Sequence, residues 1–152
     1  MTGIDRVAVV GGGVGGVSVI AALRAGGFDG DVVLIDEGEF PYDRPPLSKA
    51  YLAGDVDLKS IALQPPEWFD DHRVQLMAHS SVGALRPRLG VIELADGRSV
   101  RADKVVLALP FSILRSSVDI AKAGFEPLKL IAIREQGMGT NSKLHVQFKN
   151  RF

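Results

Sequence analysis

The chain has 152 residues, enough for one domain with a real hydrophobic core, and 46% of them are hydrophobic, as in ordinary soluble proteins. Its formal net charge of +0 gives no electrostatic footprint for nucleic acid or for an anionic membrane. No apolar stretch approaches the ~20 residues of a membrane span, and the N-terminus, which carries an acid, is unlike a signal peptide. We therefore expect a cytoplasmic protein without nucleic-acid or membrane partners.

The residues that usually bind metals are scarce in this sequence. It contains no cysteine, which excludes disulfides, zinc–thiolate sites and thiol redox pairs. The three histidines, His72, His79 and His145, lie far apart and show no metal-ligand spacing. We expect no metal site.

The N-terminal part predicts a βαβ unit. Residues 6–10 form an apolar run that predicts a buried strand, and it leads directly into a glycine-rich stretch. Apolar residues at helical spacing predict a helix over 14–25, which Gly26 and Gly27 end. A second strand is predicted over 31–36.

Shorter elements are predicted in the middle of the chain. After a loop over 37–46, rich in proline, glycine and charge, two helices are expected, at 47–52 and at 66–71. Strands then follow at 74–77, 81–85, 91–94 and 99–101. The stretch ADGR between the last two contains the Asp-Gly pair favoured in tight hairpin turns, so a small antiparallel meander is expected.

The last third begins with an apolar, β-branched run at 105–109 that predicts a buried strand ended by Pro110. Beyond the proline, helices are expected over 119–123 and 127–136, followed by a loop at 137–140. A half-buried strand is predicted at the end, with Leu144, Val146 and Phe148 on its inner face.

Gly11, Gly13 and Gly16 form the motif G-x-G-x-x-G between the first strand and the first helix. In a phosphate-binding loop the first glycine permits the sharp turn, the second lets backbone approach a pyrophosphate, and the third allows close helix–strand packing. The helix N-terminus adds unpaired N–H groups and a positive dipole. The motif, placed between a strand and a helix, predicts a dinucleotide site.

An acid at the end of the second strand supports the same interpretation. Asp36 lies 20 residues beyond Gly16, where a carboxylate accepts hydrogen bonds from an adenosine ribose, and the adjacent Glu37 could substitute for it. The acid disfavours the 2′-phosphate of NADP. A purely NAD-binding domain would continue with alternating strands and helices, whereas this chain inserts a loop and a meander, which favours FAD.

The loop EFPYDRPPLSKAYLAG, residues 39–54, resembles the corresponding loop of bacterial flavin-dependent ferredoxin reductases. The likeness runs from Arg6 to about Ala108 and includes WFDDHRVQL and ADGRSVRADKVVLA. This resemblance implies that Arg44 and Lys49 lie close to the FAD pyrophosphate and isoalloxazine. It also implies that backbone at Val82 contacts adenine, and that the turn after Ala108 meets the cofactor. A guanidinium pairs well with phosphate, and an ammonium can stabilise an anionic reduced flavin.

Residues 105–152 are similar to a segment of flavin-dependent amine oxidases instead. The similarity rests on LALPFSIL and on the run from PLK through AIRE to GTNSKLHVQF. Ferredoxin reductases have Ala-Thr-Gly where this chain has Ala108-Leu109-Pro110, and they continue with a second glycine motif and a Gly-Asp element. The two resemblances together imply a chimera or a truncated flavoprotein, with a seam at Leu109-Pro110.

We therefore predict an α/β chain with a truncated Rossmann-like FAD/NAD(P)-binding fold, a parallel sheet and a small antiparallel meander. Residues 1–110 would form the FAD-binding domain, and residues 111–152 a tail packed on that domain or on a second chain. The predicted function is FAD binding of the flavoprotein oxidoreductase type, without a separate NADH domain or a complete substrate domain and with no assigned catalytic residue. Three alternatives stay open: an active oxidoreductase completed by another chain or a homodimer, an NAD- or ADP-binding module, and a cofactor-free scaffold.

Overall fold

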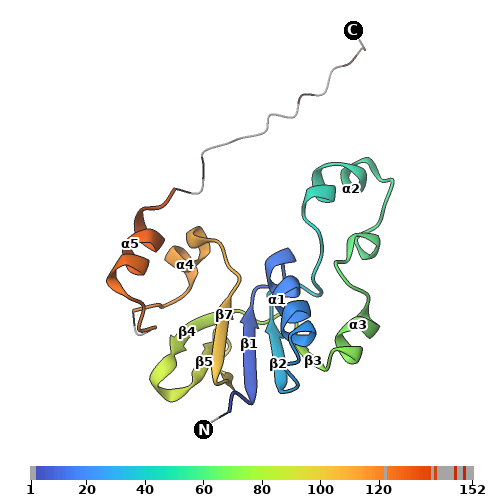
Figure 1. Cartoon of the computed structure of the whole chain (residues 1–152). Coiled ribbons are helices and arrows are strands. Elements are labelled where there is room, and N and C mark those ends of the chain that lie inside the picture. Colours follow the sequence, from blue (N-terminus) through green and yellow to red (C-terminus); the bar gives the residue numbers. More distant parts are fainter. Residues whose placement is uncertain (1–2, 122, 138, 140–145, 147–148, 150–152) are drawn as a thin grey trace.

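A four-stranded parallel sheet lies at the centre of the fold in the computed structural model, which describes residues 3–121, 123–137, 139, 146 and 149 (Figure 1). The strands β1 (Arg6–Val10), β2 (Asp31–Ile35), β3 (Val74–Met77) and β7 (Lys104–Leu107) lie in the order β3-β2-β1-β7. All neighbouring pairs are parallel, and their carboxyl ends therefore meet at one edge of the sheet.

Helices cover one face of this sheet. Side chains alternate between the two faces along β1 and β2, so Val7, Val9, Val32 and Leu34 point to the same side. There they pack against Ile20 of α1 (Val14–Ala25) and Phe69 of α3 (Pro66–Asp71). The predictions of β1, α1, α3 and β3 are confirmed to the residue. In the first three a glycine or proline marks a boundary: Gly11 follows β1, Gly26 follows α1 and Pro66 begins α3.

A second sheet covers the other face. The strands β4 (Val82–Arg86), β5 (Val91–Leu94) and β6 (Ser99–Arg101) form an antiparallel meander. The 3-10 turn η3 (Pro87–Leu89) joins the first two, and the predicted ADGR hairpin joins the last two with Gly97 at φ +89°. The apolar side chains of this meander form one cluster with Ala8, Val10, Val33 and Ile35 of the parallel sheet; they are Val82, Leu85, Ile92, Leu94 and Val100.

The loop between β2 and β3 projects beyond the carboxyl edge of the sheet (Figure 1). It contains η1 (Pro45–Ser48), α2 (Ala50–Ala53) and η2 (Lys59–Ile61) before α3 begins. The single helix predicted over 47–52 is therefore wrong in its bounds: two short helical turns form, divided at Lys49, whose backbone leaves the helical region.

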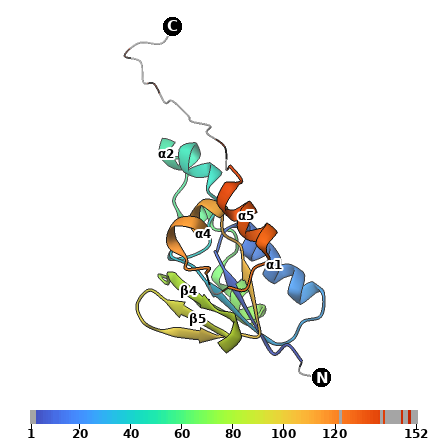
Figure 2. The ribbon, with the colours of Figure 1, turned by 90° about the vertical axis from the view of Figure 1, so that its left-hand side faces the viewer.

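Two helices follow β7 in the described part of the chain, and only one of them was predicted. Residues 111–117, which carried no helix prediction, form α4 (Phe111–Ser117), while α5 (Pro127–Glu135) agrees with the prediction within one residue. Leu114, Val118 and Ile133 are buried in the cluster that the meander forms with the parallel sheet. Figure 2 shows α4 and α5 beside one another above β4 and β5.

The short helix predicted around Asp119 is wrong. Asp119 instead forms a parallel bridge with Ala84, with Asp119 N–H donating to the Gly83 carbonyl at 3.0 Å. Sequence period does not reveal such a bridge because it depends on the position of β4 in the fold. Most of the strand predicted over 144–148 lies outside the described residues.

The strand β7 differs from its prediction in burial. Residues 105–109 were expected to form a buried strand, but β7 runs from Lys104 to Leu107 and Val105 is 39% exposed. The reason is that β7 is the last strand of its sheet among the described residues. In the same described part of the chain, none of the helices is long and apolar enough to span a bilayer.

Candidate nucleotide-binding site

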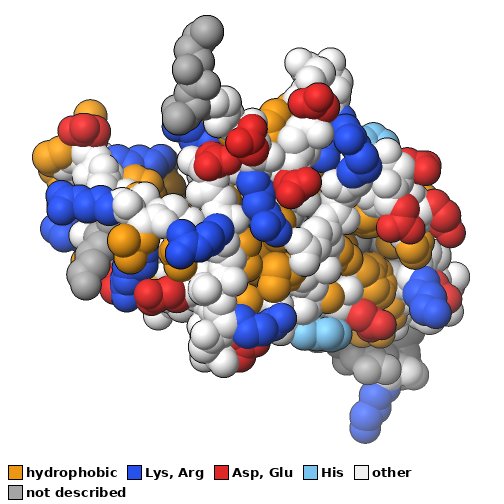
Figure 3. Space-filling model, turned by 90° about the horizontal axis from the view of Figure 1, so that it is seen from below, with side chains coloured by type: hydrophobic (Ala, Val, Ile, Leu, Met, Phe, Trp, Pro, Cys, Tyr) orange, Lys and Arg blue, Asp and Glu red, His pale blue; other side chains and the backbone are white. Residues whose placement is uncertain are grey.

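A cavity of about 520 Å³ lies at the carboxyl ends of β1 and β2. Its polar wall comes from the glycine loop Gly11–Gly13 and from the turn 36–38, with Arg44 at its rim. Its apolar wall comes from the end of β7 and from α4. Open parallel sheets bind their ligands at this edge. The opposite edge, where the strands begin, carries mixed positive and negative side chains with apolar ones between them (Figure 3).

The three motif glycines have different surroundings. Gly11 has φ +104°, and a Cβ there would lie 2.7 Å from the Ala108 carbonyl oxygen. A Cβ on Gly16 would overlap the carbonyl oxygen of Gly11, so α1 approaches the loop as closely as glycine permits. Gly13 precedes α1, and a Cβ on it would meet nothing within 4 Å. Backbone at Gly13 is therefore open to the cavity.

Gly12 also belongs to the site, although its place between the motif glycines gave no reason to select it. Its N–H donates to Oδ2 of Asp36 at 2.5 Å. A Cβ on Gly12 would lie 2.9 Å from Cγ of Asp36, so a side chain there would collide with the carboxylate. The only signal in the sequence was the run of three consecutive glycines.

The two candidate ribose acceptors, Asp36 and Glu37, both line the cavity. Asp36 is half-buried, and its second oxygen, Oδ1, accepts a hydrogen bond from Gly38 N–H at 2.8 Å. A carboxylate has roughly four acceptor positions, so two backbone donors leave capacity for ribose hydroxyls. Glu37 is exposed and accepts a hydrogen bond from the Ser81 hydroxyl at 2.9 Å.

The remaining predicted site residues divide into two groups. Arg44, Val82 and Ala108 line the cavity, and Val82 is also part of the core, with only 8% of its surface exposed. Lys49 is exposed in the loop between η1 and α2 and is not among the cavity-lining residues. The structure thus gathers one basic side chain of the PYDRPPLSK segment at the cavity.

The apolar wall was missed from the sequence. Leu109, Pro110, Ile113 and Val118 line it, together with Ser117. None of these side chains was selected as a binding residue, and the place of Ile113, Ser117 and Val118 depends on α4, which the sequence did not predict. On the polar side, the buried Ser80 was missed as well; its N–H donates to the Asp36 carbonyl at 2.9 Å. Within the described residues, no group of three or more His, Cys, Asp or Glu is placed to hold a metal ion.

A parallel sheet with a glycine loop after β1, an acid after β2 and a cavity between them defines a Rossmann-like dinucleotide-binding fold. The family model described as pyridine nucleotide-disulphide oxidoreductase matches residues 5–131, and the chain belongs to that family.

Individual relatives agree with this assignment. Rhodocoxin reductase of Rhodococcus erythropolis is 40% identical over 103 residues, which are 67% of this chain and 24% of the relative. Putidaredoxin reductase of Pseudomonas putida is 38% identical over 109 residues, or 71% of this chain and 26% of the relative. Among solved structures, the covalent putidaredoxin reductase–putidaredoxin complex matches with a TM-score of 0.64 and 38% identity, covering 68% of this chain and 25% of that one.

The chain spans about a quarter of the length of these relatives. The matched part is the N-terminal FAD-binding region of ferredoxin reductases, which confirms the resemblance predicted for residues 6–108. FAD is the cofactor of this family of flavoproteins. The family match continues past Ala108 to residue 131, and the amine-oxidase resemblance finds no support in these matches.

The residues of the cavity fit the ADP portion of FAD. Open backbone at Gly13 leaves room for a diphosphate, and carboxylate oxygens at Asp36 can accept ribose hydroxyls. The apolar side chains of Val82 and Ile113 offer contact to a flat base. Arg44 supplies a cation at the same rim.

Proposed function

We propose that this chain binds FAD through its ADP portion in the cavity at the carboxyl ends of β1 and β2. The observation that supports this most directly is the position of Gly13, whose side toward the cavity is open while its neighbours Gly11 and Gly16 are tightly packed. A diphosphate needs backbone to approach it closely, and only the second motif glycine offers that approach here.

The proposed roles follow the order of groups along the cavity. Gly11 and Gly13 would face the diphosphate, with Gly16 holding α1 against the loop. Asp36, or Glu37 beside it, would accept hydrogen bonds from the ribose hydroxyls. These roles require no large rearrangement, because the groups already line one cavity.

The remaining predicted residues are assigned to the rest of the cofactor. Backbone at Val82 and Ala108 would lie against the nucleotide, since both residues line the cavity. Arg44 would pair with phosphate, and Lys49, in the projecting loop, would lie nearer the flavin. FAD supplies the redox chemistry when bound, and the chain contributes position and charge.

The test is a titration of the purified chain with FAD, followed by flavin fluorescence together with solution mass. Saturable binding of one FAD per chain is expected. Protein that binds no FAD would contradict the proposal and leave a cofactor-free scaffold. The solution mass tests in the same experiment whether the chain forms a homodimer.

A second candidate is a module that binds any ADP-containing dinucleotide. It is favoured by the cavity itself, whose polar groups all suit an ADP portion, while Lys49 lies outside it. NAD and ADP that compete with FAD at similar affinity would support this alternative. FAD that binds far more tightly than ADP would show that the flavin half also contacts the chain.

The proposal includes four further predictions made from the sequence. They are a domain boundary at residue 110, an amine-oxidase origin of residues 105–152, oxidoreductase activity completed by another chain, and a cytoplasmic location. Leu114 and Ile133 pack into the cluster that the meander forms with the parallel sheet, which favours a tail that belongs to the same folded unit. Limited proteolysis tests this: cleavage should not release residues 111–135 from an intact core.

A further inference from the structure

We propose that Asp36 positions the glycine loop for its ligand, in addition to any contact it makes with a ribose. In this role the carboxylate would hold Gly12 and Gly38 in place before a nucleotide arrives. The proposal rests on the proposed function, since it concerns the same cavity, but it also makes a claim about the ligand-free chain.

The carboxylate of Asp36 connects two loops that are far apart in sequence. Oδ2 accepts from the N–H of Gly12 in the loop after β1, and Oδ1 accepts from the N–H of Gly38 in the loop after β2. The first loop carries the open backbone at Gly13, and the second continues to Arg44. The Asp36 side chain therefore connects the two loops that carry the proposed phosphate-binding groups.

The backbone of Asp36 is itself fixed at the end of β3. Its N–H donates to the Met77 carbonyl at 3.1 Å, and its carbonyl accepts from Ser80 N–H at 2.9 Å. Gly38 is held in the same way, because its carbonyl accepts from His79 N–H at 3.1 Å. The carboxylate thus connects the glycine loop to backbone that is itself hydrogen-bonded to the end of β3 and the residues after it.

Both partners of the carboxylate are residues without a side chain. A Cβ on Gly38 would lie 2.9 Å from Oδ1 of Asp36, as close as a Cβ on Gly12 would lie to Cγ. A side chain at either position would push the carboxylate away. This explains why positions 12 and 38 carry glycine, although neither is one of the three glycines of the predicted phosphate-binding motif.

The charge of Asp36 and its positioning bonds have opposite expected effects on the affinity for an anionic ligand. A carboxylate near a diphosphate is repelled by it, so loss of the charge alone should strengthen the binding of an anionic ligand. Loss of the positioning bonds should weaken binding, because the loop must then be ordered at the moment of binding. Asp36→Asn would therefore raise the affinity through the loss of charge and lower it through the loss of the positioning bonds.

The test compares Asp36→Asn with Glu39→Gln by calorimetry, using ADP and 2′,3′-dideoxy-ADP as ligands. Glu39 is exposed in the same loop and does not line the cavity, so E39Q removes the same charge without the bonds. We expect D36N to weaken both ligands by about tenfold or more, and E39Q to leave both affinities unchanged or slightly higher. If D36N weakens ADP but not 2′,3′-dideoxy-ADP, Asp36 is only a ribose acceptor and the proposal fails. If D36N leaves the affinity for both ligands unchanged or makes it higher, the proposal fails as well.

A measurement without ligand separates this proposal from the proposed function. In the free chain, a scalar coupling across the hydrogen bond should join the amide nitrogen of Gly12 to Cγ of Asp36 in the NMR spectrum. D36N should shift the Gly12 and Gly38 amides and speed their hydrogen exchange. A missing coupling, or amides that D36N leaves unchanged, would overturn the positioning role even if FAD binds.

The converse result is equally distinct. If the coupling is present but neither FAD nor ADP binds, the proposed function fails while the loop connection stands. Asp36→Glu serves as a second variant should D36N not fold, since it keeps the charge but moves the oxygens by one methylene. The same loss of affinity for both nucleotides is expected from it.

Discussion

The two walls of the cavity differ in what builds them. The polar wall consists mainly of backbone N–H groups and the carboxylates of Asp36 and Glu37, and the missing side chains of the glycines at 11, 12 and 38 leave the necessary space. The apolar wall consists of ordinary side chains on α4, such as Ile113, whose position comes from the burial of Leu114 in the core. The polar wall requires glycine at particular positions, whereas the apolar wall requires only that its residues be apolar.

The largest effect is expected at Gly16, where the polar wall depends on close packing. Gly16→Val places carbon atoms where the Gly11 carbonyl lies, so α1 must move away from the loop. We expect a loss of at least about 2 kcal/mol in the free energy of unfolding, or failure to fold. Urea unfolding followed by circular dichroism measures it.

Gly15 provides the matched control for that substitution. It is exposed on α1, and a Cβ there would make only an ordinary contact with Ala108 at 3.9 Å. Gly15→Ala should therefore be neutral or stabilise the helix by about 0.5–1 kcal/mol. Equal losses from G16V and G15A would contradict the packing argument.

Gly13 separates binding from folding within the same loop. Its backbone at φ −73° accepts any residue, and a Cβ meets no neighbour, so Gly13→Val should fold with an unchanged melting temperature. The side chain would occupy space that a diphosphate needs, and FAD affinity should fall at least about 100-fold. Unchanged FAD affinity in a folded G13V variant would show that the phosphate site is elsewhere.

A smaller effect is expected on the apolar wall. Ile113→Ser removes apolar contact surface from the cavity, and because Ile113 is 42% exposed the fold should be little affected. FAD affinity should fall about threefold. Ile131→Ser on α5 is the control, since Ile131 is 46% exposed and does not line the cavity. If the two variants weaken FAD equally, α4 is not part of the site.

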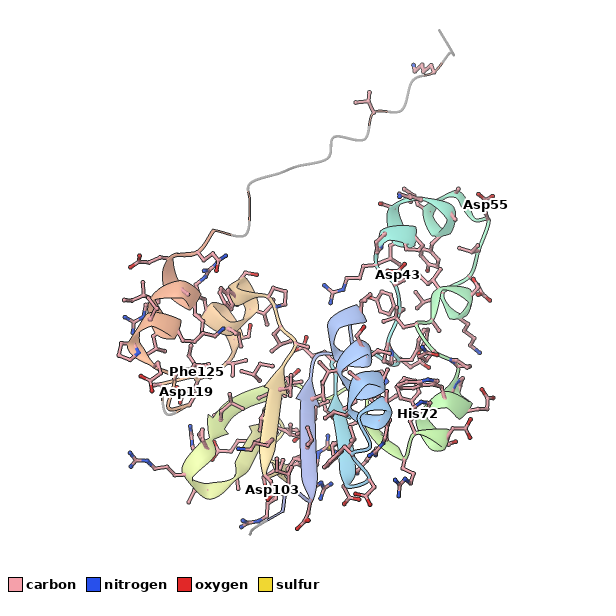
Figure 4. The ribbon with its side chains drawn as sticks, in the orientation of Figure 1. Asp43, Asp55, His72, Asp103, Asp119 and Phe125 are labelled. Atoms are coloured by element: carbon pink, nitrogen blue, oxygen red, sulfur yellow. The ribbon has the colours of Figure 1, made fainter. Side chains whose placement is uncertain are left out.

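The smallest effect is expected at Asp103, at the opposite edge of the sheet (Figure 4). Its carboxylate accepts from the N–H groups of Arg6 and Asp5 at 2.8 and 2.9 Å, and these bonds lower its pKa. A lowered pKa in the folded state contributes stability above the ordinary carboxyl pKa, and that stability is lost as pH falls through the folded-state value.

Asp103→Asn should therefore melt slightly below wild type at pH 7, with a difference that shrinks as the solution is acidified. Melting curves of both proteins across the acidic range measure this. FAD affinity at pH 7 should be the same in both, because Asp103 lies away from the cavity. A difference in melting temperature that grows on acidification would contradict the assignment.

The same contrast explains how far the sequence could be interpreted. The βαβ unit, Asp36 and the hairpin at Gly97 follow from local requirements of backbone and turn, and they were predicted. The helix α4 was not, because the apolar run after Pro110 resembles a strand as much as a helix until its burial is known. The carboxylate bonds of Asp36 likewise depend on how two loops meet in space.

In the proposed complex, FAD binds with its ADP portion against the polar wall. The most direct measurement is a map of backbone amide shifts in the labelled chain as FAD is added. We expect saturable shifts at Gly12, Gly13 and Gly38, with smaller ones at Val82, and little change along β5 and β6. Binding with shifts confined to the meander, or no saturable shift in the glycine loop, would contradict it.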